Sequence, residues 1–410
     1  MPPQAKKTLE TKRSALMLRY MQYVEMINLK NALRNIWNDD GSTRRLDPFI
    51  LFLVFLSLLY RQTIKLRDRL YDTGVFKGRK LPGKVISIGN ITVGGTGKTP
   101  MVILLANMLK KQGYLPAILS RGYGGKKKSP VNVVSDGAHL LMGYMEAGDE
   151  PVLSAKSVPG IPVLTGPKRI LTGEFALETM GADVLILDDG FQHRRLGRDI
   201  DIVLLDAARP FGNGRLLPRG PLRESTEALK RADIIVWTGG DNDMDEKYGY
   251  DGVPPRSLTS VCPWCDSAPV FRGYHRPKYL TQAATGKTYP PEYLNGKKVC
   301  AFAGIGSPES FRKTLESLGG RVVAFIPFPD HHHYHRKDIT VIRGTAAGST
   351  AETIVTTEKD GIKLAEFPSF LEDIFFLHIE MEIVPSGEAF ETMILEKLKA
   401  WKTPSPIIGQ

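Results

Sequence analysis

The residues best suited to chemistry in this chain surround a Gly-Lys-Thr tripeptide at residues 97–99. A lysine in such a tripeptide can reach the β- and γ-phosphates of a nucleotide, and the hydroxyl of Thr99 can ligate Mg²⁺. Backbone N–H groups of a glycine-rich turn can approach the same phosphates closely. The candidate phosphate-binding residues are Gly94, Gly95, Thr96, Gly97, Lys98 and Thr99. The usual form of this motif has a further glycine where this chain has Thr92.

The segments on either side of the turn are those that such a motif requires. Residues 85–88 form a β-branched run that suits a buried strand, and residues 101–109 are apolar and rich in helix formers. A strand, a glycine-rich turn and a helix that begins near Thr99 are the layout of a phosphate-binding P-loop. A second Gly-Lys-Thr at residues 286–288 has no apolar strand before it and two prolines after it, so we predict a loop there.

Two adjacent carboxylates, Asp188 and Asp189, follow a strongly apolar segment at residues 183–187. Ligands of open α/β sheets bind at the carboxyl ends of the strands. A P-loop site also needs a carboxylate at such a strand end to hold Mg²⁺, directly or through water. We therefore predict a metal site at these aspartates, although a polar cap on a strand-to-turn junction is the alternative.

Other polar segments offer candidates for proton transfer and phosphate contacts. Asp149 and Glu150 form an acidic pair, and phosphoryl transfer to a hydroxyl needs a base that orients or accepts its proton. Residues 330–335 hold four of the eight histidines, which could bind a metal, tune a catalytic carboxylate, contact phosphate or form an exposed polar loop. Arginines among Gly and Pro at residues 215–224 suit either phosphate contacts or a solvated basic loop.

The composition limits the classes of protein to which the chain can belong. Its 410 residues are enough for two domains, and a hydrophobic content of 42% suits a globular protein. The formal net charge of +11 favours anionic partners, whether nucleotides, phospholipid headgroups, nucleic acid or acidic substrates. Three cysteines argue against a disulfide framework and fit a reducing compartment. We interpret Cys262 and Cys265 as unbridged loop thiols, since a zinc site would need further ligands.

The N-terminal region has a different character. Residues 1–47 form a polar, basic leader, which fits an organelle-targeting segment or a disordered arm. Residues 48–60 are almost wholly apolar, but they are fewer than the about 20 residues that span a bilayer. A basic stretch follows, so we predict a membrane-associated helix over residues 48–72 that lies in the membrane surface. An ordinary core helix is the alternative.

The rest of the chain predicts an α/β fold. Strands and helices alternate over residues 80–240, which predicts a P-loop domain with a mainly parallel sheet flanked by helices. Residues 241–295 are rich in Gly, Pro, Asp, Asn and Tyr and lack periodicity, so we expect a loop-rich insertion or linker. The alternation resumes over residues 296–400, which predicts a second, smaller α/β lobe.

Several of these segments together resemble the tetraacyldisaccharide 4′-kinase family, the lipid A kinases. The matching motifs occur in the order of the family and span roughly residues 80–365, and the apolar segment before them is similar to the family's N-terminal membrane helix. The motifs lie at residues 89–100, 120–124, 148–151, 188–193, 217–224, 303–306, 328–332 and 356–360.

The resemblance implies that the chain transfers the γ-phosphate of ATP to the 4′-hydroxyl of an acylated glucosamine disaccharide 1-phosphate, with ATP and Mg²⁺ as cofactors. It implies that Asp149 is the catalytic base and that His331 pairs with it, although His332 and His333 are adjacent and the alignment could choose either. It places Asp188 and Asp189 at the metal. The other residues that it implies in the active site are Gln192, Arg223 and Glu224.

The partners implied by the resemblance are the lipid acceptor and a membrane surface, with no nucleic acid and no obligatory protein partner. The long basic leader indicates an organellar, plant-type member at the mitochondrial inner membrane, whereas a bacterial member would act at the cytoplasmic face of the inner membrane. Two other functions stay open from the residues alone. One is a P-loop NTPase switch that acts with a protein partner at a membrane, and the other is a non-enzymatic membrane adaptor with a vestigial loop.

Overall fold

A computed structural model describes residues 33, 36, 37, 47–127, 129–239, 268–384 and 387–399. Nearly all of the predicted leader, as well as Cys262 and Cys265, lie outside these residues. The chain divides into two compact units. The first comprises the residues up to Arg69 and the segment Arg209–Ser225, and the second comprises Leu70–Ala208 and the residues from Thr226 onward.

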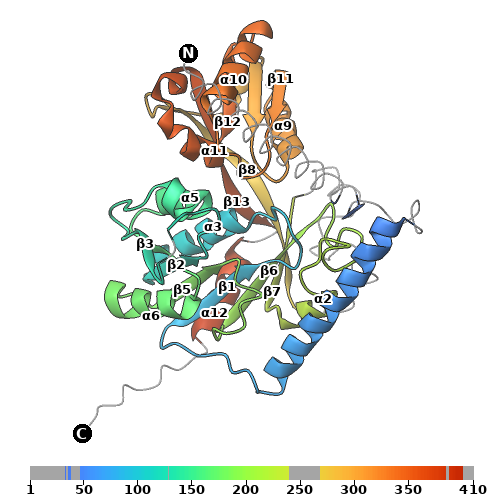
Figure 1. Ribbon diagram of the computed structural model, residues 1–410. Coiled ribbons are helices and arrows are strands. Elements are labelled where there is room, and N and C mark those ends of the chain that lie inside the picture. The colour runs from blue at the N-terminus through green and yellow to red at the C-terminus, as the bar shows by residue number, and fades with distance from the viewer. Residues whose placement is uncertain are drawn as a thin grey trace, which may run out of the picture. The chain divides into compact units, whose positions relative to one another are not determined.

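The first unit is built on helix α2 (Pro48–Asp72), drawn in blue in Figure 1. The apolar residues 48–60 and the basic stretch after them form one continuous helix of 25 residues, with the bounds that the sequence predicted. The segment Arg209–Ser225 is hydrogen-bonded to it, because Ser57 Oγ donates to the Leu216 carbonyl (2.9 Å) and Tyr60 OH donates to the Arg223 carbonyl (2.8 Å). Within the described residues, α2 is the one helix that is long and apolar enough to cross a membrane by length and composition.

The second unit contains one 13-stranded sheet in the order β11-β10-β12-β13-β8-β7-β6-β1-β5-β2-β4-β3, with β9 paired to β8. Its strands are β1 (Lys84–Gly89), β2 (Pro116–Ser120), β3 (Asn132–Ser135), β4 (Val163–Thr165), β5 (Val184–Asp188), β6 (Ile200–Asp206), β7 (Ile234–Thr238), β8 (Val270–Gln282), β9 (Thr288–Tyr289), β10 (Lys298–Ala303), β11 (Arg321–Pro327), β12 (Thr353–Thr357) and β13 (Ile374–Val384). All pairs are parallel except β13 with β8, β3 with β4 and β8 with β9. The mainly parallel sheet predicted from the sequence is confirmed.

The helices of the second unit cover both faces of this sheet (Figure 1). They are α3 (Lys98–Lys111), α4 (Tyr144–Ala147), α5 (Asp149–Ser157), α6 (Arg169–Met180), α9 (Pro308–Ser317), α10 (Arg336–Gly348), α11 (Glu358–Lys363) and α12 (Gly387–Lys399). Short 3₁₀ helices occur at η1 (Thr226–Arg231), η3 (Pro291–Leu294), η4 (Leu364–Glu366) and η5 (Pro368–Asp373). Of the α-helices, α4 and α10 were not predicted.

The P-loop lobe shows how the strand pattern places the helices. Ile86 and Ile88 of β1 share a core with α3, whereas Val85 shares the opposite core with α6. Successive side chains of a strand point to opposite faces, so a strand that is buried on both sides needs a continuous apolar run. The sequence has that run, and β1 therefore holds the P-loop at the centre of the lobe.

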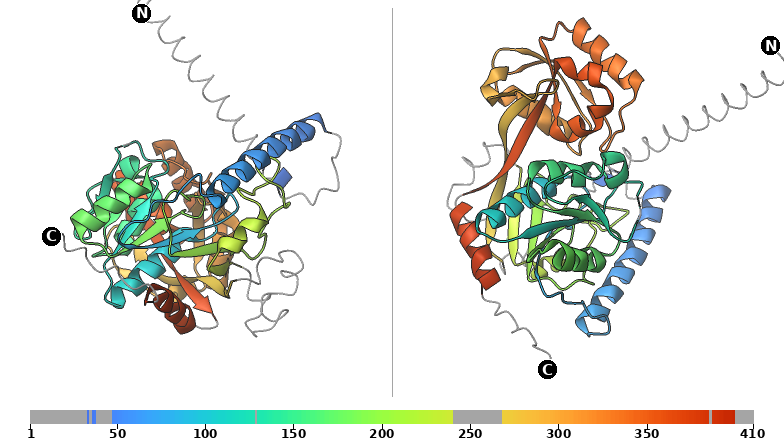
Figure 2. Two further views of the ribbon diagram at one scale, coloured as in Figure 1. Left: turned by 90° about the horizontal axis from the view of Figure 1, so that it is seen from below. Right: turned by 90° about the vertical axis from the view of Figure 1, so that its left-hand side faces the viewer.

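The second lobe repeats this arrangement on a smaller scale. Ala301 of β10 packs with Phe311 of α9, and Phe302 packs on the other face with Ile342 of α10. Two long strands, β8 and β13, run antiparallel to each other and belong to both lobes (Figure 1). Helix α12 then packs in the core of the P-loop lobe (Figure 2), so the described C-terminal residues do not all belong to the second lobe.

The prediction of a loop-rich segment at residues 241–295 is wrong for its described part. Residues 240–267 lie outside the described residues, but β8 supplies 13 residues of strand after them. The strand was missed because it is largely polar and contains Pro277, which sits where the β8–β13 register shifts between His378 and Ile379. Proline is accepted in a strand at such an irregularity, since the regular ladder is interrupted there.

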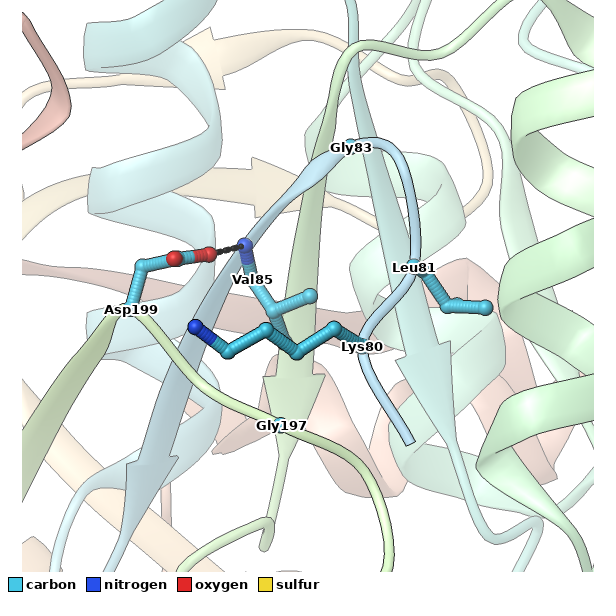
Figure 3. A pocket seen from close by; sticks show the side chains of 6 residues that line it. All are labelled: Lys80, Leu81, Gly83, Val85, Gly197 and Asp199. Atoms are coloured by element: carbon cyan, nitrogen blue, oxygen red, sulfur yellow. Dashed lines mark hydrogen bonds between the residues drawn. The ribbon is translucent and has the colours of Figure 1, made fainter. Parts of the chain in front are cut away.

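A small pocket lies at the amino-terminal edge of the P-loop lobe (Figure 3). It is lined by Lys80, Leu81, Gly83, Val85, Gly197 and Asp199. The Asp199 carboxylate accepts a hydrogen bond from the Val85 N–H (2.7 Å) and so ties the start of β1 to the start of β6. The P-loop follows the other end of β1, so this pocket is separate from the phosphate-binding turn.

Candidate active site

The phosphate-binding turn has the predicted layout, with β1 ending at Gly89 and α3 beginning at Lys98. Gly97 caps the helix in the left-handed region with φ of 78°, where a side chain is strained. A Cβ added there would also lie 2.6 Å from Nε2 of His275, on β8. The Thr238 hydroxyl at the end of β7 donates to the Thr96 carbonyl (2.8 Å). Neighbouring strands therefore fix the backbone of the turn from one side.

The predicted metal-site carboxylates lie directly beside this turn. Asp188 ends β5, whose residues pair with β1, and Asp189 follows it with φ of 56°, in the left-handed region. The Nζ of Lys98 lies 3.5 Å from Oδ1 of Asp189. Burial raises the pKa of Asp188 to about 7, and the nearby carboxylates of Glu150 and Asp189 raise it as well. The charges of Lys98 and Arg169 lower the pKa of Asp188 but do not outweigh these causes.

This donor set fits Mg²⁺. The described residues contain no group of three His, Cys, Asp or Glu side chains that could hold a metal by themselves. Mg²⁺ is usually bound by one or two carboxylates together with substrate phosphates and water, so a complete protein cage is not expected. Thr99, Asp188 and Asp189 supply oxygen donors of the required kind next to the phosphate-binding turn.

Asp149 lies in the first turn of α5, after Gly148, whose φ is 95°. A carboxylate in this position is stabilised by the positive end of the helix dipole. Nδ1 of His331 lies 2.9 Å from both carboxylate oxygens of Asp149, and the Glu150 N–H donates to Oδ1 (3.0 Å). The structure therefore brings together two residues that are 182 positions apart in the chain.

The four histidines of residues 330–335 face different partners. His331, with φ of 60°, turns toward Asp149, whereas Nε2 of His332 lies 3.1 Å from Oδ2 of Asp338. The ring of His333 lies near that of Tyr144, and His335 precedes α10. Non-glycine residues with positive φ cost free energy and cluster at functional sites. The segment thus presents one histidine to a carboxylate, which is one of the readings that the sequence left open.

Two lysines of α11, Lys359 and Lys363, lie beside Asp149, Glu150 and His331, and we call these five residues the Asp149 corner. The sequence did not indicate the two lysines as site residues. Nζ of Lys359 lies 3.1 Å from Oε1 of Glu150 and 3.5 Å from Oδ1 of Asp330. Nζ of Lys363 lies 3.3 Å from Oδ2 of Asp149, and its side chain is only 1% exposed. The available signal was their spacing of four residues, which puts both on one face of a helix.

These contacts move the pKa values of Asp149 and His331 apart. Burial raises the pKa of Asp149, but the hydrogen bond from His331 and the charges of Lys359 and Lys363 outweigh burial and hold it well below its ordinary value. Burial lowers the pKa of His331, but the hydrogen bond to Asp149 and the nearby carboxylates raise it above its ordinary value. Asp149 is therefore held as an anion.

The three remaining predicted site residues have different positions. Nε2 of Gln192 donates to the carbonyl of Asn90 (2.8 Å), at the start of the phosphate-binding turn. Arg223 and Glu224 belong to the first unit, where the buried Glu224 carboxylate forms an ion pair with Arg67 of α2. Their predicted place in the active site stays a prediction.

The model of the LpxK family, described as tetraacyldisaccharide-1-P 4′-kinase, matches residues 49–399. The chain belongs to the tetraacyldisaccharide 4′-kinase family. This confirms the family, the kinase activity in lipid A biosynthesis and the fold class that the sequence predicted.

Individual relatives agree with this membership. A tetraacyldisaccharide 4′-kinase of Syntrophus aciditrophicus is 54% identical over 91% of this chain and 100% of its own length. One of Geobacter sulfurreducens is 40% identical over 80% of this chain and 88% of its own. The crystal structure of an LpxK from Aquifex aeolicus in complex with ATP has a TM-score of 0.67 and 34% identity, and covers 85% of this chain and 99% of its own.

The comparisons do not support every expectation. These relatives are bacterial, and they give no support to the expected organellar, mitochondrial member. The ATP complex of the Aquifex aeolicus protein supports ATP as the nucleotide.

Proposed function

We propose that this chain uses Lys98, Asp149 and the Asp188–Asp189 pair to transfer the γ-phosphate of ATP to the 4′-hydroxyl of a tetraacyl disaccharide 1-phosphate. The observation that supports this assignment is the convergence of two kinds of group in one unit. The Nζ of Lys98 lies 3.5 Å from the carboxylate of Asp189, a candidate metal ligand. A second carboxylate, that of Asp149, is ionised and paired with His331.

The phosphate-binding turn supplies the positioning. Backbone N–H groups of residues 94–97 and of the start of α3 can donate hydrogen bonds to bound phosphates, and Lys98 supplies a positive charge beside the transferred group. Thr99, Asp188 and Asp189 would hold Mg²⁺, which neutralises charge on the β- and γ-phosphates when it is bound. The transition state of phosphoryl transfer is loose, so positioning and charge stabilisation supply most of the rate.

Asp149 acts on the acceptor hydroxyl. A carboxylate with so low a pKa is a weak base in the ground state, so we assign it two roles, orientation of the hydroxyl by a hydrogen bond and late removal of its proton. A loose transition state needs little early deprotonation of the nucleophile. His331 then stabilises the carboxylate through its Nδ1–H and fixes the direction of the free lone pairs.

Helix α2 brings the enzyme to its lipid. Its exposed apolar side chains are Phe49, Leu51, Phe52, Val54, Phe55, Leu58, Leu59 and Leu66. Only 11% of its most apolar window is buried, which disfavours the alternative of a core helix in a soluble protein. Arg61 and Lys65 follow and are placed to meet anionic headgroups. An acceptor with four acyl chains resides in a bilayer, so a membrane-associated helix meets the demand of the substrate.

The transfer reaction is tested with ATP labelled in the γ-phosphate and a purified tetraacyl disaccharide 1-phosphate. We expect label in the lipid product at the 4′-position, and its loss with Asp149→Asn. A chain that hydrolyses ATP at the same rate without the lipid, and leaves the lipid unlabelled, would contradict the assignment.

Membrane association is tested by co-sedimentation with anionic phospholipid vesicles. Deletion of residues 48–60 removes all of the exposed apolar side chains of α2 except Leu66, and we expect the deleted protein to remain in the supernatant. The milder double variant Phe52→Ser/Phe55→Ser, at positions that are 55% and 57% exposed, should weaken binding while the fold is retained. Unchanged sedimentation of both proteins would count against lipid docking.

A further inference from the structure

The two lysines of α11 have the same arrangement, each between one carboxylate of its own lobe and one of the P-loop lobe. Lys359 lies between Asp330 and Glu150, and Lys363 lies between Asp360 and Asp149. The two lysines are four residues apart, so they project from one face of the helix. That face lies on the acidic first turn of α5.

The ammonium group of Lys363 forms an ion pair with Asp360 of the same helix. The Asp360 carboxylate is fully buried, and its Oδ2 accepts hydrogen bonds from the Gly304 N–H (2.9 Å) and the Thr357 hydroxyl (2.7 Å). Its Oδ1 lies 3.4 Å from Nζ of Lys363. This network gives the ammonium group a fixed place, from which it reaches Oδ2 of Asp149.

Exclusion of water strengthens the electrostatic interaction between Lys363 and Asp149. The side chains of Asp149 and Lys363 are 6% and 1% exposed, so their attraction is screened much less than that of a surface pair. A buried carboxylate without a cation would tend to take up a proton and lose its ability to accept one from a hydroxyl.

We propose that Lys359 and Lys363 are positioning residues for phosphoryl transfer, which hold the Asp149 carboxylate ionised and oriented from the opposite lobe. This inference rests on the proposed role of Asp149. The charged groups that face Asp149 are Lys359, Lys363 and Asp360 of α11, His331 and Asp330 of the loop after β11, and Glu150 of its own helix.

The test is the pH profile of kcat for Lys363→Met, Lys359→Met and the double variant, measured with the full chain from pH 4.5 to 9. Activity needs ionised Asp149 and is lost as pH falls through the pKa of Asp149. Loss of a neighbouring cation raises that pKa by about 1–3 units. The wild-type pKa of Asp149 lies below this range, so wild type should show no acid limb from Asp149 within it. We expect such a limb to enter the range from its acid end in the variants, most clearly in the double variant. We also expect kcat at pH 8 to fall about 10-fold or more with little change in the KM for ATP.

Charge and shape are separated by further variants. Lys359→Arg keeps the cation on the more exposed of the two lysines, and it should retain the wild-type pH profile where Lys359→Met does not. Lys397→Met removes an ion pair with Asp233 (2.8 Å) in the same unit, away from α5, and should leave the profile unchanged. If Lys363→Met fails to fold because two buried carboxylates lose their cation, the Lys359 variants still decide the question.

The outcomes distinguish this inference from the function on which it rests. If Asp149→Asn keeps wild-type activity, the proposed role of Asp149 is wrong. If Asp149→Asn is inactive while the folded lysine variants keep the wild-type profile, or lose activity equally at every pH, only the positioning role is overturned.

Discussion

The phosphate-binding turn and the Asp149 corner lie in the same unit but are assembled in opposite ways. The turn is one continuous piece of chain, β1 to α3, and its shape is carried by the backbone. The Asp149 corner joins α5, the loop after β11 and α11, and its properties come from side-chain charges. A backbone site depends on which residues allow a conformation, whereas a side-chain site depends on which distant residues become neighbours.

The departure at Thr92 illustrates the first kind of dependence. The usual motif has glycine there, but within the described residues only Asp189, His331 and Thr350 are non-glycine residues with positive φ. Thr92 therefore carries its side chain without the strain that would demand glycine. The position that does demand glycine is Gly97.

The largest expected effect is at Lys98. Lys98→Met keeps the length of the side chain but removes the charge that contacts the β- and γ-phosphates, so we expect kcat to fall about 10³-fold or more. The measurement is lipid phosphorylation at saturating ATP, with thermal unfolding to check the fold. Lys111→Met, an exposed lysine at the other end of the same helix, is the control and should be near wild type.

A smaller effect tests the backbone origin of the turn. Gly97→Ala introduces a left-handed alanine and a Cβ that would meet His275, so we expect a cost of about 1–2 kcal/mol in the free energy of unfolding and a clear loss of ATP affinity. Gly113→Ala is the matched control, because its φ is 85° but nothing lies within 4 Å of an added Cβ. Gly113→Ala should carry a similar strain cost in the free energy of unfolding but keep wild-type ATP affinity, measured by calorimetry, because it lies beyond the other end of α3. Wild-type ATP affinity in Gly97→Ala would contradict the backbone origin of the turn.

The smallest effect tests the charge origin of the Asp149 corner. The pKa of His331 is raised in the folded protein, so its protonated form adds stability below its unfolded pKa of about 6.5. That stability is lost as pH rises through the folded pKa. We therefore expect His331→Gln to lower the free energy of unfolding more at pH 6 than at pH 9, as measured by urea denaturation. A difference that is the same at both pH values would argue that His331 acts by packing alone.

The same contrast explains what the sequence could predict. The apolar runs of β1 and β5 and the helix-forming residues of α3 are local signals, and those elements were predicted within a residue or two of their bounds. The pairing of Asp149 with His331 came only from the family resemblance, because no local spacing relates residues of separate elements. Lys359 and Lys363 were missed for the same reason, because the residues on one face of a helix do not indicate which distant segment that face will contact.

Two elements were missed for reasons of local chemistry. Strand β8 joins two lobes, and a strand that is partly exposed on both faces has no apolar alternation to detect. Helix α10 contains Ile339, Thr340, Val341 and Ile342 in succession, and β-branched residues of this kind favour strands. Burial of four of its side chains in the second lobe outweighs this preference and stabilises the helix.

The route of the chain through β8, β13 and α12 also determines the order in which the hydrophobic cores of the two lobes can be completed during synthesis. Phe390 and Ile394 of α12 belong to the hydrophobic core of the P-loop lobe. This lobe is therefore synthesised first, but its core can be completed only after the second lobe has emerged from the ribosome. In a translation product that stops before β13, the edge of β8 that pairs with β13 would be exposed beside an incomplete apolar core. Chaperones and proteases bind surfaces of that kind, so premature termination anywhere before α12 should yield no stable nucleotide-binding fragment.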